Sequence, residues 1–270
     1  WTLVGAGIVK KEESARPTDS LIPDGAKWLQ DHVTTFDPEN NQVETSSHGK
    51  IYYDFLIVSP GIEIDWGRIK GLKEALGTKE VCSNYSYEHV GYTWDTLEKF
   101  TGGTALFTHP ASPVKCGGAP QKIMYLAEEY FMKTGIRGSS RVVFGSANPA
   151  IFDVAKYRDA LEKVLERKQI ETHFRVNLTE IKADEKVAIF ENLDAGESFE
   201  ISYDMIHVTP PMQAPAFIRN SSLADSGGWV DVDKHTLQHK RFKNVFGLGD
   251  CTNLPTSKTG AAIRKQAPVV

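Results

Sequence analysis

Residues 104–108 read TALFT, and this short apolar run after Gly103 predicts a buried strand. A helix is expected after it from Pro120 to about Lys133, because proline is favoured at the first helical position. The alternation continues with a strand, a helix and a strand at residues 141–144, 153–168 and 170–174. Strands that alternate with helices favour a parallel sheet, so we expect an α/β fold with a βαβαβ unit here.

Outward from this unit, three further strands are predicted at residues 178–183, 187–192 and 203–208, the first two as an antiparallel excursion. The flanks resemble parts of a second α/β domain that the first one interrupts. We therefore predict three segments: a partial domain at 1–102, a complete Rossmann-like domain at 103–211, and a return to the first domain at 212–270.

The N-terminal flank is expected to be mostly strands. The first residues, with Gly5 and Gly7, are predicted to form a loop. Short strands are expected at residues 27–30, 33–36, 42–45 and 50–53. The run 54–58 is almost wholly apolar and ends in a Ser-Pro-Gly turn, which favours a strand buried on both faces.

Composition excludes several classes of protein. The 270 residues carry 31 Lys and Arg against 35 Asp and Glu, a formal charge of −4, so no basic footprint for nucleic acid is present. No apolar run has the roughly 18 residues of a membrane helix. Three cysteines are too few for a disulfide scaffold. The chain starts without Met and ends in an apparent helix, so we expect a fragment.

Two phrases point to a flavoprotein. NVFGLGD at 244–250 brings a Gly-Asp pair to the end of a short strand, which alone is an ordinary strand-to-turn sequence. YDFLIVSPG at 53–61 resembles the strand that closes the FAD domain of flavoproteins with two dinucleotide-binding domains. In those proteins an aspartate in the place of Asp250 meets the ribityl hydroxyls of FAD, and a turn like that at Gly61 follows the other strand. Together the phrases predict FAD as cofactor.

Glycine-rich phosphate loops are missing from both predicted domains. An FAD domain opens with a strand and G-x-G-x-x-G, which we expect upstream of Trp1. The loop 108–118 stands where a nicotinamide cofactor would need the same spacing, but it has two prolines and a cysteine instead. We therefore do not expect NAD(P)H as the electron donor.

The cysteines differ in their surroundings. Cys116 precedes a predicted helix, whose positive N-terminal end favours a thiolate, and two glycines after it leave room for a small reactant. The alternative is a buried structural cysteine. Cys251 follows Asp250 and is interpreted as a packing residue, and Cys82 is given no role. No metal site is predicted, because His235 and His239 have no acidic partner in a zinc-binding motif.

At this point the chain resembles the sulfide:quinone oxidoreductases of mitochondria and bacteria. The motif SPVKCGGAPQKIMYL at 112–126 looks like their central cysteine motif. The matching phrases elsewhere are WTLVGAG at 1–7, GWVDVD at 228–233 and GDCTNLPTSKT at 249–259.

The resemblance implies a chemistry and a set of residues. Sulfide would attack a disulfide beside FAD, a cysteine persulfide would form, and the electrons would pass through FAD to ubiquinone or another quinone. The sulfur would go to a small acceptor such as glutathione or sulfite. Cys116 matches the persulfide-carrying cysteine. Asp250 and Lys258 match flavin-contacting positions, and Val33 falls where the backbone meets the adenine.

The same resemblance places other parts outside this chain. The family's second redox cysteine lies in a later segment, so a Cys116–Cys251 disulfide is not expected. The helices that attach the family peripherally to a membrane also come later, and this chain alone is expected to be inactive. The implied location is the mitochondrial inner membrane, or the cytoplasmic membrane surface in bacteria.

Two alternatives stay open. One is the flavoprotein subunit of a flavocytochrome-type sulfide dehydrogenase, which passes electrons to a haem protein. The other is a catalytically silent domain used for binding. A type II NADH dehydrogenase is less consistent with the sequence, because the nicotinamide loop is missing.

Overall fold

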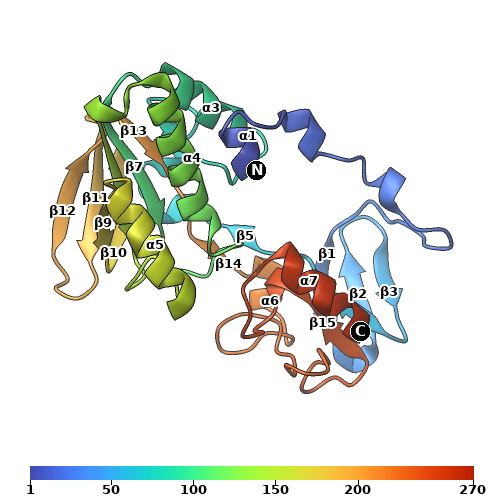
Figure 1. Cartoon of the computed structure of the whole chain (residues 1–270). Helices are drawn as coiled ribbons and strands as arrows, with labels where there is room; N and C mark the ends of the chain where they lie inside the picture. The colour runs from blue at the N-terminus through green and yellow to red at the C-terminus, as the bar shows by residue number, and fades with distance from the viewer. The chain divides into compact units, whose positions relative to one another are not determined.

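A computed structural model describes all 270 residues, which form two units (Figure 1). Unit 1 contains residues 1–16, 65–113 and 117–211. Unit 2 contains residues 17–64, 114–116 and 212–270. The predicted middle domain, 103–211, falls almost wholly in unit 1, which also takes residues 65–102 from the flank predicted as a partial FAD domain. Strand pairing explains this division, because the flank supplies an edge strand to the sheet of unit 1.

Unit 1 is built on a parallel sheet of five strands. Their order is β6 (Val81–Cys82), β13 (Met205–His207), β7 (Gly103–His109), β8 (Ser140–Ser146) and β9 (Glu171–Phe174). Helices α4 (Ala119–Thr134) and α5 (Ala155–Arg167) connect β7 to β8 and β8 to β9. The predicted βαβαβ unit and the α/β class are therefore confirmed.

The period of two along β7 sends alternate side chains to two different layers. Ala105 and Phe107 join the core with α4, where Phe131 is fully buried. Leu106 faces the other way, toward the antiparallel sheet of β10 (Val176–Lys182), β11 (Val187–Asn192) and β12 (Ser198–Ser202). Figure 1 shows this sheet and α4 on opposite sides of β7. Each large side chain buried in this way contributes roughly 1.5–3 kcal/mol.

One glycine sets how closely the two sheets of unit 1 approach. A Cβ atom at Gly145 in β8 would lie 2.7 Å from the ring of Phe190 in β11. That distance is too short for a side chain, so glycine allows the Phe190 ring to pack directly on the parallel sheet.

Smaller helices complete the unit: α1 (Thr2–Gly5), α2 (Leu72–Ala75) and α3 (Val90–Lys99).

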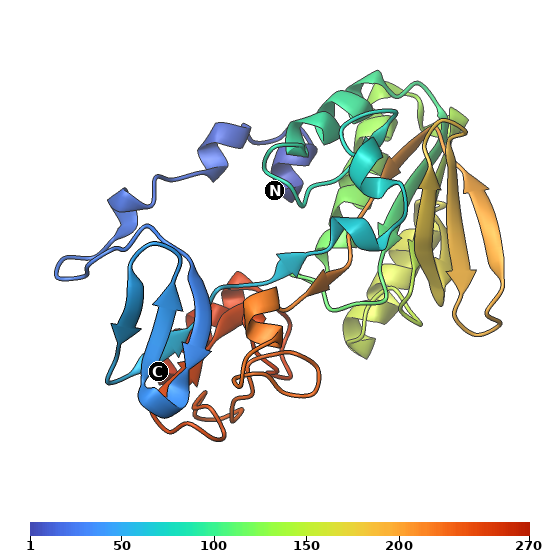
Figure 2. The same ribbon diagram turned by 180° about the vertical axis from the view of Figure 1, so that it is seen from behind.

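Unit 2 is assembled from three small sheets. An antiparallel sheet of β1 (Val33–Asp37), β2 (Gln42–Thr45) and β3 (Gly49–Tyr52) is visible in Figure 2. The other two are pairs: β4 (Leu56–Val58) with β15 (Val245–Gly247), parallel, and β5 (Glu63–Ile64) with β14 (Met212–Gln213), antiparallel. Helices α6 (Ala216–Arg219) and α7 (Gly260–Gln266) belong to the same unit.

Three sequence-based predictions about the N-terminal flank were wrong. The strand at 54–58 is shorter and is not buried on both faces: Phe55 is 73% exposed and Ile57 56% exposed, because β4 pairs only with β15. Residues 27–30 form no strand, since strand-like pairing starts only where Ser46 donates to the carbonyl of His32. The segment around Gly5 is a short helix and not a loop.

No helix in the structure is long and apolar enough to cross a bilayer. No group of three or more His, Cys, Asp and Glu side chains is arranged to hold a metal ion.

Candidate active site

The Gly-Asp turn follows directly from the β4–β15 pair of unit 2. The backbone N–H of Leu248 donates to the carbonyl of Val58 at 3.2 Å, and the chain then turns through the 3-10 helix Gly249–Cys251. Gly249 has φ +78°, which favours glycine, and its N–H donates to Oε1 of Gln266 at 2.8 Å. The turn is thus fixed from two sides, by a neighbouring strand and by α7.

One carboxylate oxygen of Asp250, at this turn, receives no hydrogen bond from the chain. This oxygen, Oδ1, is buried. Burial raises the pKa of the Asp250 carboxyl, and the ammonium groups of Lys258 and Lys115 oppose that rise. A buried acceptor without a donor costs free energy, so this oxygen is suited to a donor from a bound molecule.

Lys258 reaches back over the turn from the loop that precedes α7. Its Nζ donates to the carbonyl oxygens of Asp250 at 2.8 Å and Thr252 at 2.9 Å. The same Nζ lies 3.7 Å from the ring centroid of Trp229. Burial lowers the pKa of Lys258, while the Asp250 carboxylate opposes this effect. The ammonium is therefore held in place mainly by backbone dipoles and an aromatic face.

Cys116 lies beside Lys258 in the same unit. Its backbone N–H donates to the Lys258 carbonyl at 2.7 Å, and Lys115 and Lys258 form an isolated parallel bridge. Cys116 has φ +62°, the left-handed region, which costs a residue with a Cβ atom about 1–2 kcal/mol. The residue is partly exposed. A strained backbone at a candidate reactive thiol is a typical feature of functional sites.

The other two cysteines are enclosed. Cys251 is fully buried, and its Sγ contacts the carbonyl of Leu248 at 3.4 Å. Cys82 is fully buried in β6, an edge strand of the unit 1 sheet, with Sγ 3.4 Å from the carbonyl of Ile206. Burial raises the pKa of both thiols to about 12. Neither is therefore a ready nucleophile.

The other two predicted site residues, Gly61 and Val33, differ in whether they contact the residues described above. Gly61 has φ +83° in the turn after β4, and a Cβ atom there would meet nothing within 4 Å. Its backbone contributes a hydrogen bond to Cys251. Val33 begins β1, opposite Thr45, and no contact links it to Asp250 or Cys116. The structure therefore brings Cys116, Asp250, Lys258 and Gly61 into one neighbourhood, with Val33 on a separate sheet of the same unit.

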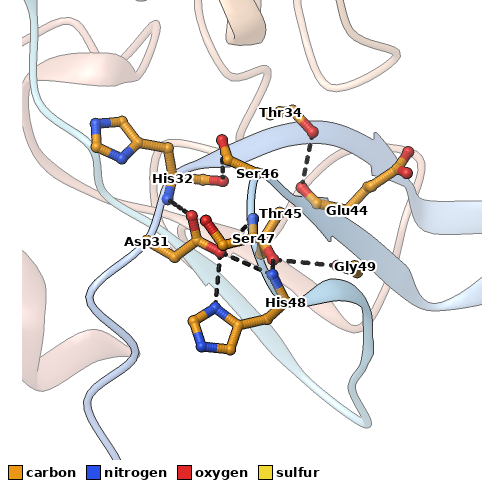
Figure 3. Close-up of polar contacts among 9 residues, drawn as sticks. All are labelled: Asp31, His32, Thr34, Glu44, Thr45, Ser46, Ser47, His48 and Gly49. Atoms are coloured by element: carbon orange, nitrogen blue, oxygen red, sulfur yellow. Dashed lines mark hydrogen bonds and ion pairs between the residues drawn. The ribbon is translucent and has the colours of Figure 1, made fainter.

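A polar cluster fixes the start of the Val33 strand (Figure 3). The Asp31 side chain is only 4% exposed and accepts hydrogen bonds from the backbone N–H groups of His32, Ser47 and His48. The ring of His48 approaches Oδ2 of Asp31 at 2.8 Å. This contact holds the pKa of the Asp31 carboxyl well below its ordinary value. Asp31 therefore ties the β2–β3 turn to the segment that leads into β1.

Sequence reasoning missed two participants. Trp229 lies in the quoted GWVDVD phrase but was given no role, because a cation–π contact depends on where a distant lysine folds. Lys115 was noted only as a neighbour of Cys116; its pKa is lowered by burial and affected by Asp250. Its backbone N–H lies 3.3 Å from Sδ of Met212. Spacing in the sequence gives no signal for either contact.

No family model matches the chain. It is 50% identical over its whole length to the mitochondrial sulfide:quinone oxidoreductase of Mus musculus and 48% identical to that of Dictyostelium discoideum, covering 60% of each. The structure of the sulfide:quinone oxidoreductase from Aquifex aeolicus superposes with a TM-score of 0.80 at 21% identity, over 96% of this chain and 62% of that one.

The fold is that of the FAD/NAD(P)-binding oxidoreductases. Within that class, the chain is a relative of the sulfide:quinone oxidoreductases over its full length, so the predicted resemblance is confirmed. The chain spans 60% of the length of these curated relatives.

Proposed function

We propose that this chain carries the FAD-contacting and sulfur-reactive centre of a sulfide:quinone oxidoreductase. The observation that carries the proposal is the direct backbone link between Cys116 and Lys258, whose side chain holds the Gly-Asp turn. This link ties a partly exposed thiol to the turn where the family places its flavin. The proposed domain roles follow: unit 2 contributes to FAD binding, and the 103–211 sheet is a Rossmann-like domain that does not take NAD(P)H.

The residues of unit 2 fit an FAD molecule. The buried Oδ1 of Asp250 has no partner in the chain, as expected for an acceptor that waits for a ribityl hydroxyl. Gly61 leaves open space at a positive φ, which allows close approach of a ligand to the backbone. Lys258 uses two of its three N–H donors on carbonyls, and one is left. Val33 is proposed to offer its backbone to the adenine.

Cys116 is proposed to be the sulfur-reactive residue, starting from a disulfide with a second cysteine. Hydrosulfide attacks the sulfur of Cys116, a new S–S bond forms there as a persulfide, and the old S–S bond breaks. The second sulfur leaves as a thiolate with the electron pair. Once the outer sulfur has passed from Cys116 to an acceptor, the freed Cys116 thiolate would re-form the disulfide with the second sulfur. The two electrons released in that step would go to FAD, which would supply the redox chemistry that passes them to a quinone. Cys82 and Cys251 are poor candidates for the second cysteine, because both are buried with a raised pKa.

The partners and location are proposed on the basis of the relatives. Hydrogen sulfide is the substrate, and ubiquinone or another quinone is the acceptor. A small thiol or oxyanion such as glutathione or sulfite removes the persulfide sulfur. The curated relatives named above are mitochondrial, so we propose a mitochondrial location, at the inner membrane where quinone is available.

An anaerobic titration tests the function. The whole natural polypeptide is purified, and its flavin absorbance near 450 nm is followed as sulfide is added and then a soluble ubiquinone analogue. We expect sulfide to bleach the band and quinone to restore it, while NADH leaves it unchanged. Bleaching by NADH, or no bleaching by sulfide, would refute the proposal. Reoxidation by a cytochrome but not by quinone would favour the flavocytochrome-type dehydrogenase.

A further inference from the structure

Trp229 sits in a turn whose backbone is held by several hydrogen bonds. The Asp225 carboxylate accepts the backbone N–H of Gly227 at 2.8 Å and of Trp229 at 3.0 Å. The N–H of Asp225 donates to the Trp229 carbonyl at 2.8 Å, and Gly228 supplies a positive φ of 84° between them. The next residue, Val230, donates to the carbonyl of Cys251 at 2.9 Å. The turn is thus closed on itself and attached to the Gly-Asp segment.

The Trp229 ring faces the Lys258 ammonium. A cation at 3.7 Å from an indole centroid lies well inside the range of a cation–π contact. The two carbonyls of Asp250 and Thr252 take two of the ammonium's N–H groups. Two chain segments, the Gly-Asp turn and the turn that carries Trp229, therefore contact one side-chain cation and hold Lys258 at its far end.

The near end of Lys258 holds Cys116. The Lys258 carbonyl accepts the Cys116 N–H at 2.7 Å, and the Lys115–Lys258 bridge lies beside it. Cys116 keeps a left-handed φ of +62°, which a residue with a side chain gives up unless its surroundings enforce it. An acceptor that is held in place restricts the Cys116 backbone more than one on a mobile loop, so a fixed Lys258 favours this conformation.

We propose that Trp229 is a positioning residue for Cys116: by holding the Lys258 ammonium, its indole ring fixes the carbonyl that keeps Cys116 in its left-handed conformation. The link from the Trp229 ring to the Cys116 backbone is a property of unit 2. Its effect on catalysis rests on the proposed function. An aromatic face and a cation are both required, so phenylalanine preserves the coupling in part and leucine removes it.

Hydrogen exchange of the Cys116 amide measures the coupling directly, because that amide makes the bond in question. The parent polypeptide is compared with Trp229→Phe, Trp229→Leu and Lys258→Met. We expect protection of the Cys116 amide to fall roughly 3- to 30-fold in Trp229→Leu and Lys258→Met, the range of a partly buried cation–π contact. Trp229→Phe is expected to retain most of the protection.

Phe242→Leu is the matched control. Its ring lies under Arg241 at 5.2 Å in the same unit, so it also loses a cation–π contact, but one that does not involve Lys258. We expect Cys116 protection to be unchanged in this variant. Amides of the β4–β15 pair report general loosening and should be unaffected in all variants. Equal Cys116 protection in the parent and Trp229→Leu would overturn the proposal, as would an equal loss in Phe242→Leu.

The functional consequence has its own readout. In Trp229→Leu, the rate of sulfide-dependent flavin reduction should fall roughly 3- to 30-fold at unchanged flavin content, and Trp229→Phe should restore most of it. If the parent shows no reduction by sulfide, the proposed function fails while the exchange data still decide the coupling. If the parent is active and Cys116 protection falls without any change in rate, the positioning role is refuted.

Discussion

Two regions of unit 2 each present a carboxylate with little access to solvent, and they treat it in opposite ways. Asp31 is surrounded by donors: three backbone N–H groups and the His48 ring (Figure 3). Asp250 has a buried oxygen with no partner, and Lys258 links its turn to Cys116, whose conformation is strained. The pKa of Asp31 is lowered and that of Asp250 is raised.

The difference separates a structural carboxylate from one suited to a ligand. A chain that satisfies every acceptor of a side chain gains stability from it. A chain that leaves an acceptor unmet and a backbone residue strained loses stability, and this is the pattern expected where another molecule completes the site. Perturbed pKa values alone do not make this distinction; the direction of the shift and its cause do.

The largest expected effect is on Cys116. Replacement by Ser keeps the size but cannot form a disulfide or persulfide, so sulfide-dependent quinone reduction should fall on the order of 10³-fold or more. Cys251→Ser should be much milder, because Cys251 is fully buried and packs in the core of unit 2. Steady-state activity with flavin content checks both. Equal loss in both variants at full flavin content would make Cys251 a redox partner.

Next in size is the change in FAD affinity when each of the two carboxylates is removed. Asp250→Ala should weaken FAD binding roughly 10- to 100-fold, because a donor on the ligand loses its charged acceptor. Asp31→Ala should change the FAD dissociation constant by less than about threefold, since its oxygens already have partners in the chain. Titration of flavin-free protein with FAD gives both values. A larger effect at Asp31 would reverse the comparison.

Thermal stability should change in opposite directions in the two variants. In flavin-free protein at pH 7, Asp31→Ala should lower the melting temperature by roughly 2–6 °C, and Asp250→Asn should raise it by roughly 1–4 °C. The exposed Asp24→Ala in the same unit is the control and should shift it by less than about 1 °C. Scanning calorimetry decides this, and a destabilised Asp250→Asn would contradict the idea of an unmet acceptor.

The smallest effect is the pH dependence of the difference in melting temperature between the parent and each of these two variants. The folded pKa of Asp31 lies below its unfolded value, so its contribution to stability is complete above about pH 4 and is lost as pH falls through the folded pKa. The gap in melting temperature between the parent and Asp31→Ala should therefore be constant from pH 5 to 7 and shrink below about pH 4. For Asp250 the sign is opposite: the parent should approach Asp250→Asn as pH falls.

The sequence predicted the parallel sheet of unit 1 well, because its strands alternate with helices at short range. It failed where a prediction depended on distant partners. Residues 54–58 have the composition of a central strand, yet their exposure was decided by β15, which lies 190 residues away at the Asn244–Asp54 contact. Composition cannot report how many neighbours a strand finds.

The site was predictable to a similar extent. Motif phrases located Cys116, Asp250, Lys258 and Gly61, which the structure brings into one neighbourhood. The left-handed φ of Cys116 could not be foreseen, since nothing in its local sequence demands it and Gly117 would adopt it more readily. Trp229 and the Asp31 cluster depend on tertiary contacts, which no spacing rule encodes.

The interleaving of the two units has a consequence for biogenesis. The strands and helices of the 103–211 sheet follow one another closely, so this sheet can form soon after its segment is synthesised. Residues 114–116 take their final place later, because the Cys116 amide bonds to Lys258 and the loop between these residues is long. The strained cysteine would thus acquire its conformation among the last events of folding. A nascent chain would carry Cys116 in a relaxed backbone conformation, and the left-handed conformation would mark completion of unit 2.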